Sequence, residues 1–385
     1  DKNDLVILLD GQKVNLTAQW DNTVNGFLWA EDGKSIFLNA ATQGTIQLFQ
    51  VKVPKKPGKP SEVIQLTEGQ FDVAGLVGQT GHTLVVARND MNQARELFAL
   101  DLKTGEMTQL THVNDSIFQS IELGKVEKRM VTTTDNKQMV TWVIYPPGFD
   151  ASKKYPTLLY CQGGPQGALS QFYSYRWNFQ LMAAQGYIVV APNRRGMPGY
   201  GVEWNEQISG DWGGQNMQDY LAAIDDMTKE PYVDADRLGC VGASYGGYSA
   251  FYLSGIHEGR FKTFIAHDGI FNTRSMYGTT EELFFVNYDM GGPYWEKDNA
   301  IAIKSYRDFN PIEKVDQWTA PILIIQGGKD YRVPIGQSLE AFQAAQLRGI
   351  KSKLLYFPEE NHWILSAQNG LVWQREFFKW LEETL

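Results

Sequence analysis

The chain changes its hydrophobic pattern near residue 125. Upstream, short apolar runs of the kind that form β-strands are separated by Gly, Asn and Asp. Downstream, near-continuous apolar runs alternate with segments of helical periodicity, which is typical of a mostly parallel sheet covered by helices on both faces. We therefore predict two domains in the 385-residue chain, residues 1–125 and residues 126–385.

Residues 1–125 contain a weak internal repeat. The segments VNLTAQWD, IQLTEGQFD and TQLTHVND place Leu16, Leu66 and Leu110 in register. A period of roughly 40–50 residues with about four strands per unit is typical of β-propeller blades. Because two to three blades cannot close a ring, we expect the last blades of a propeller whose other blades lie upstream. A small β-sandwich is the alternative, although it would not require the shared Leu-Thr endings.

The downstream part alternates predicted strands and helices. The predicted strands are VTWVIYP, TLLYCQG, YIVVAPN, RLGCVGA, FKTFIAHD, PILIIQGG and SKLLYFPE. Helices are predicted at residues 216–229 and 335–348 and near the end of the chain. In that last helix, Trp373, Phe377, Trp380 and Leu381 share one face and predict its buried side.

A serine lies between small residues at the end of one of these strands. Gly242-Ala243-Ser244-Tyr245-Gly246 fits G-x-S-x-G, with the strand RLGCV before it and a helix-like segment after it. In an α/β hydrolase this context forms a tight turn that lifts the serine hydroxyl above the sheet edge. We interpret Ser244 as a nucleophile, and a structural Gly-rich loop is the alternative.

An acid and a histidine follow in the order that an α/β hydrolase requires. Asp330 follows the strand PILIIQGG, and His362 follows the next strand. Asp268, one strand earlier, is a rival acid. His267 is interpreted as a hydrogen-bonded group behind the site. The three other histidines of the chain are predicted on the surface, namely His82, His112 and His257.

The oxyanion of an acyl-transfer reaction needs two hydrogen-bond donors. The N–H of Tyr245 is one candidate, because it directly follows the nucleophile. The loop TLLYCQGGPQG follows an earlier strand, and its glycines Gly163 and Gly164 permit a close approach of the backbone. We expect the second donor in this loop, and a plain turn is the alternative.

Composition argues against several classes of partner. A net charge of −9 without a long basic run makes nucleic acid an unexpected partner. No apolar run reaches the roughly 18 residues of a membrane span. Neither cysteine lies in a metal-binding spacing, and no phosphate-binding glycine motif is present, so we expect no metal and no cofactor.

In this order and behind propeller-like repeats, the segments QGGPQG, NRRGMPGYG, GASYGGY, GGKDYRVP and ENHW resemble the prolyl-oligopeptidase family of serine peptidases. The resemblance implies an α/β-hydrolase domain preceded by a propeller. It also implies the triad Ser244, Asp330 and His362, with Tyr245 and Gly164 as oxyanion donors.

Further roles follow from the resemblance alone. Gln162, which stands where relatives usually carry His or Tyr, would complete the oxyanion loop. Arg332 would hold the substrate carbonyl one residue upstream of the scissile bond, and a solvated loop arginine is the alternative. An apolar pocket for the residue before that bond would be lined by Val333, Phe271, Tyr277, Phe284 and Phe285. Glu281 and Glu282 are interpreted as helix-surface residues rather than as a clamp for the substrate amine.

The resemblance implies a peptidase that acts on peptides and releases N-terminal dipeptides with small or apolar residues before the cut, through an acyl-enzyme. An acylaminoacyl peptidase or a carboxylesterase on the same triad is the first alternative. An inactive binding scaffold is the second. A periplasmic location is expected by resemblance to bacterial relatives. A homodimer is one option for the oligomeric state.

Overall fold

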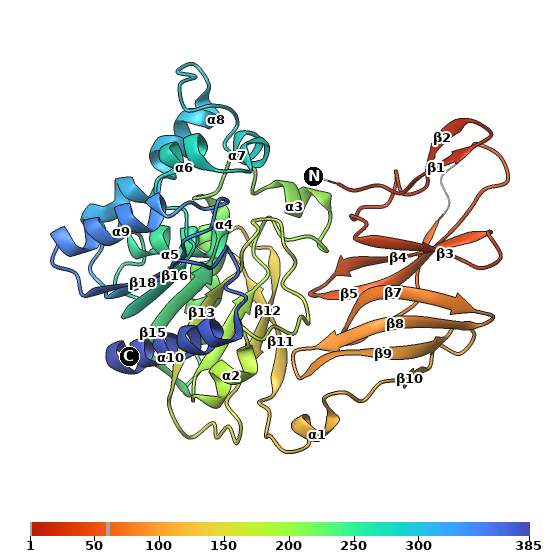
Figure 1. Ribbon diagram of the computed structural model, residues 1–385, viewed down its shortest axis with the longest axis horizontal. Coiled ribbons are helices and arrows are strands. Elements are labelled where there is room, and N and C mark those ends of the chain that lie inside the picture. The colour runs from red at the N-terminus through yellow and green to blue at the C-terminus, as the bar shows by residue number, and fades with distance from the viewer. Residues whose placement is uncertain (1, 59–61) are drawn as a thin grey trace. The chain divides into compact units, whose positions relative to one another are not determined.

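The structure is a computed structural model that describes residues 2–58 and 62–385 (Figure 1). These residues form two compact units. The first contains the described residues up to Leu123, together with Ala168–Gln180 and Met197–Glu206. The second contains Gly124–Gly167, Leu181–Gly196 and Gln207–Leu385.

The first unit is built from antiparallel strands. One four-stranded sheet has the order β3-β4-β5-β6, and its strands are Gly26–Trp29, Ser35–Thr42, Thr45–Lys52 and Val63–Gln65. Another has the order β10-β9-β8-β7, and its strands are Met107–Gln109, Gln93–Asp101, Thr83–Asp90 and Asp72–Thr80. The unit also contains a hairpin of β1, Val6–Leu9, and β2, Gln12–Asn15. Two short helices complete it, α1 at Asp115–Phe118 and α3 at Val202–Glu206.

The strand β4 separates two cores within the first unit. Ile36 and Leu38 pack in a cluster that includes residues of the hairpin β1–β2. Phe37 points to the opposite face and packs in a cluster with residues of β7, β8 and β9. Because side chains alternate along a strand, one sheet buries both of its faces and links the hairpin to the next sheet.

The Leu-Thr repeat corresponds to a repeated hydrogen-bond pattern. Beside β5, Leu66 N–H donates to Leu48 O at 2.8 Å, and Thr67 Oγ1 accepts the N–H of Leu48 at 2.9 Å. The Thr67 hydroxyl in turn donates to Gln47 Oε1 at 2.8 Å. One threonine therefore joins two neighbouring residues of the adjacent strand.

This pattern occurs three times among the described residues. In the other two copies, the Leu-Thr pair and its two partner residues are Leu110-Thr111 with Glu96-Leu97 and Leu16-Thr17 with Asp4-Leu5. The weak sequence repeat thus marks a recurring structural joint, and in each copy it lies at the last strand of a hairpin.

The second unit contains an eight-stranded sheet in the order β11-β12-β14-β13-β15-β16-β17-β18. Its strands are, in chain order, Val126–Thr132, Gln138–Ile144, Tyr155–Cys161, Ile188–Pro192, Val233–Ala243, Thr263–His267, Ile322–Gly327 and Ser352–Phe357. From β14 to β18 all neighbouring pairs are parallel, so their carboxyl ends meet at one edge. The seven predicted strands are confirmed, and β11 is an additional antiparallel strand.

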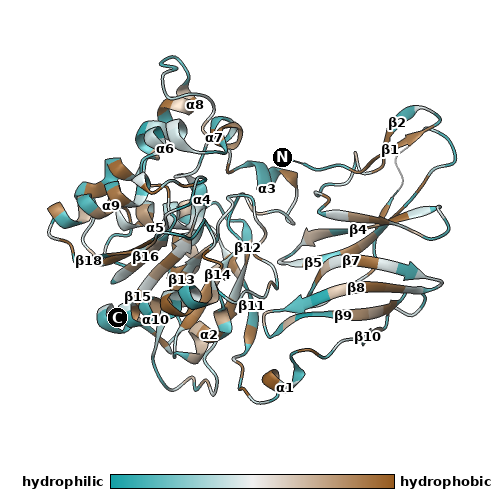
Figure 2. Cartoon of the chain, viewed as in Figure 1, coloured by the Kyte–Doolittle hydropathy of each residue, from teal (hydrophilic) through white to brown (hydrophobic). Residues whose placement is uncertain are grey.

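The helices α4, α5, α6, α7, α8, α9 and α10 belong to the second unit, at Gln215–Met227, Tyr245–Ser254, Thr273–Thr279, Leu283–Asp289, Ala300–Ile303, Gly336–Leu347 and Ala367–Thr384. The helix α2, Phe179–Ala184, begins with the last two residues of the segment Ala168–Gln180 and continues into the second unit. A π turn and a 3₁₀ helix follow α8 at Lys304–Asp308 and Pro311–Gln317. The predicted apolar face of α10 is buried. Central strands such as β14 and β16 are completely buried and coloured as mostly hydrophobic in Figure 2, as expected for strands covered on both faces. Among the described residues, none of the helices has both the length and the apolar character needed to cross a bilayer.

Asp72, the first residue of β7, binds the segment Ala168–Gln180 to the sheets of the first unit. Its Oδ2 accepts the Ser170 hydroxyl at 2.6 Å, and its Oδ1 accepts the N–H groups of Ile46 and Gln171 at 2.8 and 3.1 Å. Burial raises the pKa of Asp72 to about 6, although these hydrogen bonds oppose the effect. The folded state therefore holds a proton on Asp72 at pH values where the unfolded chain has lost it.

We predict that Thr67→Val lowers the free energy of unfolding by about 1–3 kcal/mol, because Leu48 N–H and Gln47 lose a buried partner. Urea unfolding measures this change. Thr108→Val, at an exposed position of β10, is the matched control and should stay within about 0.5 kcal/mol of the parent chain. Equal losses in both variants would contradict the role of the joint.

We predict that Asp72→Asn removes part of the pH dependence of stability. Because the pKa of Asp72 is raised in the folded state from 3.8 to about 6, its contribution to stability declines as the pH rises through this window. The parent chain should therefore lose about 2–3 kcal/mol relative to the variant between pH 4 and pH 7. Parallel stability curves for the two proteins over this range would contradict the assignment.

Candidate active site

The predicted nucleophile lies on a strained turn between β15 and α5. β15 ends at Ala243, α5 begins at Tyr245, and Ser244 between them has φ +60°. A non-glycine residue in this left-handed region is strained, and such strain is common at functional positions. The Ser244 N–H donates to His267 O at 2.9 Å, and the residue is partly exposed. The turn thus presents the hydroxyl above the carboxyl edge of the sheet.

Two glycines allow this turn to pack against its neighbours. A Cβ atom at Gly246 would overlap the carbonyl oxygen of Cys161, at the end of β13. A Cβ atom at Gly163, in the following loop, would lie 3.1 Å from Ala243 O and 3.5 Å from Ser244 Cβ. The predicted oxyanion loop therefore lies directly beside the serine.

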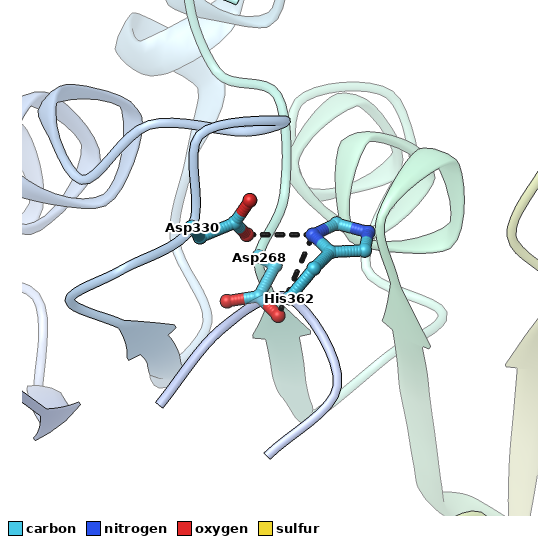
Figure 3. A group of neighbouring side chains, drawn as sticks. All are labelled: Asp268, Asp330 and His362. Atoms are coloured by element: carbon cyan, nitrogen blue, oxygen red, sulfur yellow. Dashed lines mark hydrogen bonds and ion pairs between the residues drawn. The ribbon is translucent and has the colours of Figure 1, made fainter. Parts of the chain in front are cut away.

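The predicted acid and base are in contact (Figure 3). His362 Nδ1 lies 2.6 Å from Asp330 Oδ2, and both side chains are almost completely buried. The other carboxylate oxygen, Oδ1, accepts the backbone N–H groups of Arg332 and Val333, each at 2.9 Å. These bonds orient the carboxylate toward the ring. A proton held on Nδ1 leaves Nε2 as the atom that accepts a proton from a nucleophile.

Backbone hydrogen bonds hold the loops that carry these two residues together. Gly328 N–H donates to Phe357 O, and Lys329 N–H donates to Glu360 O, both at 2.8 Å. Glu360 also accepts the backbone N–H of Leu365 at 2.8 Å. Burial alone would raise the pKa of Glu360, but hydrogen bonds lower it overall. The histidine loop is thus fixed from both sides.

The rival acid Asp268 lies close to the same ring. Its Oδ2 is 3.8 Å from His362 Nδ1, so Asp330 makes the shorter contact. The three side chains each offer one metal-ligand atom, and these atoms lie within 4.8 Å of one another. An ion held about 2 Å from each atom would require them to be farther apart than the 2.6 Å between His362 and Asp330. The arrangement therefore suits proton transfer better than metal binding.

Arg194 is a functional candidate that the sequence analysis missed. It is fully buried, and its guanidinium donates to the carbonyl oxygens of Pro165 and Gln162, at 2.9 and 3.3 Å. It also lies over the ring of Tyr245, 4.6 Å from the centroid. Arg194 therefore supports both predicted sources of oxyanion donors. The Gln162 side chain accepts the Tyr160 hydroxyl at 2.8 Å.

Arg332 forms ion pairs with the two glutamates that were interpreted as surface residues. Its Nη2 lies 2.9 Å from Glu282 Oε1 and 3.5 Å from Glu281 Oε1. The guanidinium also lies over Trp363, 4.9 Å from the ring centroid. The Thr280 hydroxyl donates to Arg332 O at 2.8 Å. The connection between α6 and α7 is thus joined to the loop that carries Asp330.

The predicted pocket residues have different surroundings. Val333 is buried, and its N–H orients Asp330. Phe271 is buried against Phe251 and Trp318. Tyr277 donates its hydroxyl to Asn287 Oδ1 and packs among other aromatic rings. Phe285 lies 6.0 Å from the ring of Trp212, whereas Phe284 is 86% exposed. Their shared role as a substrate pocket stays a prediction.

The prediction that His257 lies on the surface is wrong. The side chain is buried, and its Nδ1 accepts the N–H of Phe261 at 3.1 Å. Burial lowers the pKa of His257 to about 4. Its ring packs against Phe261 and Phe264, so it belongs to the core.

Comparison with known proteins gives the same assignment of family. The sequence profile of the prolyl oligopeptidase family matches residues 173–385. The dipeptidyl-peptidase 5 of Porphyromonas gingivalis is 47% identical over 378 residues, which cover 98% of this chain and 54% of that protein. The same enzyme of Porphyromonas endodontalis is 49% identical over 351 residues, 91% of this chain and 50% of that protein. The chain spans about half the length of these curated relatives.

Solved structures agree on the fold. The Pyrococcus horikoshii acylaminoacyl peptidase matches 99% of this chain and 59% of its own, with a TM-score of 0.85 and 24% identity. Porphyromonas gingivalis dipeptidyl peptidase 4 matches 96% of this chain and 51% of its own, with a TM-score of 0.78 and 19% identity. The predicted fold class is confirmed by these likenesses.

We predict that His362→Gln slows the labelling of Ser244 by a fluorophosphonate at least about 10³-fold, because the serine loses its base. The second-order rate of labelling measures this effect. His257→Gln is the matched control, because it changes the same side chain in the core. The His257→Gln variant should be less stable without a comparable loss in the rate of labelling. Equal rates of labelling in both variants would show that His362 is not the base.

Proposed function

Because the chain belongs to the prolyl oligopeptidase family, we propose that it carries the catalytic domain of a serine peptidase that releases dipeptides from the N-termini of peptides. The observation that carries this proposal is that Ser244, on the strained turn after β15, and the buried Asp330–His362 pair, in the loops after β17 and β18, all follow parallel strands of one sheet. The two dipeptidyl-peptidase 5 relatives support an N-terminal dipeptide as the acyl group that the serine takes up.

In the proposed mechanism, Ser244 Oγ attacks the scissile carbonyl carbon while His362 Nε2 takes its proton. Asp330 holds the proton on Nδ1 and stabilises the imidazolium. The electron pair of the C=O bond moves to the oxygen, which accepts hydrogen bonds from the N–H groups of Tyr245 and Gly164. The imidazolium then protonates the leaving amine, and an acyl-enzyme remains. Water, activated by the same histidine, releases the dipeptide.

The side chains around Arg332 support a substrate with a free amine. Arg332 contributes one positive charge, whereas Glu281 and Glu282 contribute two negative charges beside it. The group therefore carries a net negative charge next to the loop of Asp330. Such a charge attracts an ammonium group and does not favour an acylated amine. In this proposal, Arg332 also donates to the carbonyl one residue upstream of the cleaved bond.

An acylaminoacyl peptidase or a carboxylesterase on the same triad is the enzymatic alternative, because the triad alone does not choose between these substrates.

The aromatic side chains near α6 and α7 would accept a small or apolar residue before the cut. The proposed aromatic pocket includes Phe285 and Tyr277.

We also propose that the first unit is part of a β-propeller completed by further blades upstream. The recurring Leu-Thr joint supports this view, because the hairpin β1–β2 has the same joint as the outer hairpins of both four-stranded sheets. The hairpin therefore corresponds to half a blade.

A periplasmic location and a homodimer are part of the same proposal, by analogy with the family.

We predict that a chromogenic dipeptide amide with a free amine is cleaved roughly 10–100-fold faster than its N-acylated form, because the amine meets the carboxylates near Arg332. The assay compares kcat/KM for both substrates on this chain and on a longer chain with the upstream residues. Ser244→Ala is the blank. Preference for the acylated substrate would favour an acylaminoacyl peptidase. Absence of turnover and of fluorophosphonate labelling in both chains would contradict the peptidase proposal.

A further inference from the structure

A second carboxylate, Asp268, faces the imidazole of the candidate triad, and the mechanism above does not use it (Figure 3). The side chain of Asp268 has no exposed surface. Its Oδ2 lies 3.8 Å from His362 Nδ1, on the nitrogen that also contacts Asp330. A buried carboxylate at this distance favours a positive charge on the ring, and salt screens the interaction weakly.

The backbone conformation of Asp268 produces this contact. The residue directly follows β16 and has φ +46°, in the left-handed region that non-glycine residues seldom adopt. Successive side chains of a strand point to opposite faces, and this turn breaks the alternation. As a result, His267 Nε2 lies 2.8 Å from Asp268 Oδ2.

The pair His267-Asp268 therefore contacts both partners of the proposed proton transfer. His267 O accepts the N–H of Ser244 at 2.9 Å, and Asp268 faces the ring of His362. This pair of residues therefore joins the backbone of the candidate nucleophile to the surroundings of the candidate base.

We propose that Asp268 is a positioning residue of the triad: a second carboxylate that stabilises the imidazolium of His362 and partly replaces Asp330 when that carboxylate is lost. This inference rests on the proposed serine peptidase chemistry. When His362 Nε2 takes the proton of Ser244, the ring gains one positive charge, and no proton moves to either carboxylate. The ring carries this charge while the oxyanion exists, and both carboxylates lie beside it.

Titratable groups that face Asp268 come from three elements. His267 belongs to β16, Asp330 lies in the loop after β17, and His362 lies in the loop after β18. Two ionised carboxylates near one ring repel each other, and the nearby imidazoles reduce this repulsion when they carry a proton.

A purely structural role for Asp268 predicts a different outcome. Its Oδ1 accepts the N–H of Gly327 at 3.2 Å, which ties the ends of β16 and β17 together. Asparagine can make the same bond and tolerates a left-handed conformation. Asp268→Asn therefore preserves this structural bond and removes the charge.

The test measures the rate of fluorophosphonate labelling of Ser244 between pH 5 and pH 9. It compares the parent chain with Asp268→Asn, Asp330→Asn and the double variant. Asp289→Asn is the matched control, because Asp289 is a buried carboxylate bonded to Trp212 and Ser209 instead of the triad. Asp268→Gly gives an independent variant, since glycine adopts a positive φ without strain.

In Asp268→Asn and Asp268→Gly we expect the acidic limb of the rate profile to move to lower pH by about half a unit to one unit, because the ring loses a negative neighbour. We also expect the loss caused by Asp268→Asn to be about tenfold larger in the Asp330→Asn background than in the parent chain. Asp289→Asn should leave the acidic limb in place. The inference would be overturned if the acidic limb of the pH–rate profile stayed in place in both Asp268 variants and the losses of labelling rate in Asp268→Asn and Asp330→Asn simply multiplied in the double variant.

A titration of ¹⁵N-labelled histidine rings separates this inference from the proposed function. The His362 signal, assigned with His362→Gln, should titrate at lower pH in Asp268→Asn than in the parent chain, whether or not the chain cleaves peptides. A parent chain that shows this shift but never labels would contradict the peptidase proposal and support the contact. An unchanged His362 titration would overturn the role of Asp268.

Discussion

The candidate site depends on close backbone contacts at the carboxyl edge of the parallel sheet. Gly246 lets the start of α5 lie against the carbonyl of Cys161, and Gly163 lets the following loop lie against Ser244. A side chain at Gly246 would collide with the carbonyl of Cys161, and a side chain at Gly163 would crowd the carbonyl of Ala243 beside Ser244. The buried guanidinium of Arg194 stabilises this loop, because it donates hydrogen bonds to the loop carbonyls of Pro165 and Gln162.

The strand order explains why the chemistry converges. Five adjacent parallel strands, from β13 to β18, each end in one part of the site. In spatial order these parts are the oxyanion loop, Ser244, Asp268, Asp330 and His362. Each part is placed by its own strand, so the site needs no long loop to bring distant groups together. The same order leaves room for two carboxylates beside one imidazole.

The strands and the contact between Asp330 and His362 were predictable because they depend on local pattern and on parallel topology. An apolar run predicts each strand, and the carboxyl ends of parallel strands must meet. The sequence offered Asp268 as a rival to Asp330, but it did not predict that both carboxylates would lie near His362, because that depends on the left-handed turn at Asp268. Arg194 and His257 were missed because charged and titratable residues are assigned to the surface by default, whereas the fold surrounds them with hydrogen-bond partners or aromatic rings. The inclusion of Ala168–Gln180 in the first unit also lacks a sequence signal, since it results from hydrogen bonds to residues far away in the chain, such as Asp72 and Asn89.

The central claim is that Ser244, the Asp330–His362 pair and the two backbone donors form one working site. A crystal structure of the chain after reaction with a peptidyl phosphonate tests it most directly. The account predicts phosphorus bonded to Ser244 Oγ, with one phosphonyl oxygen within about 2.7–3.1 Å of the N–H groups of Gly164 and Tyr245. It also predicts that His362 keeps its contact with Asp330. An adduct on another residue, or a phosphonyl oxygen that points away from both N–H groups, would contradict the account.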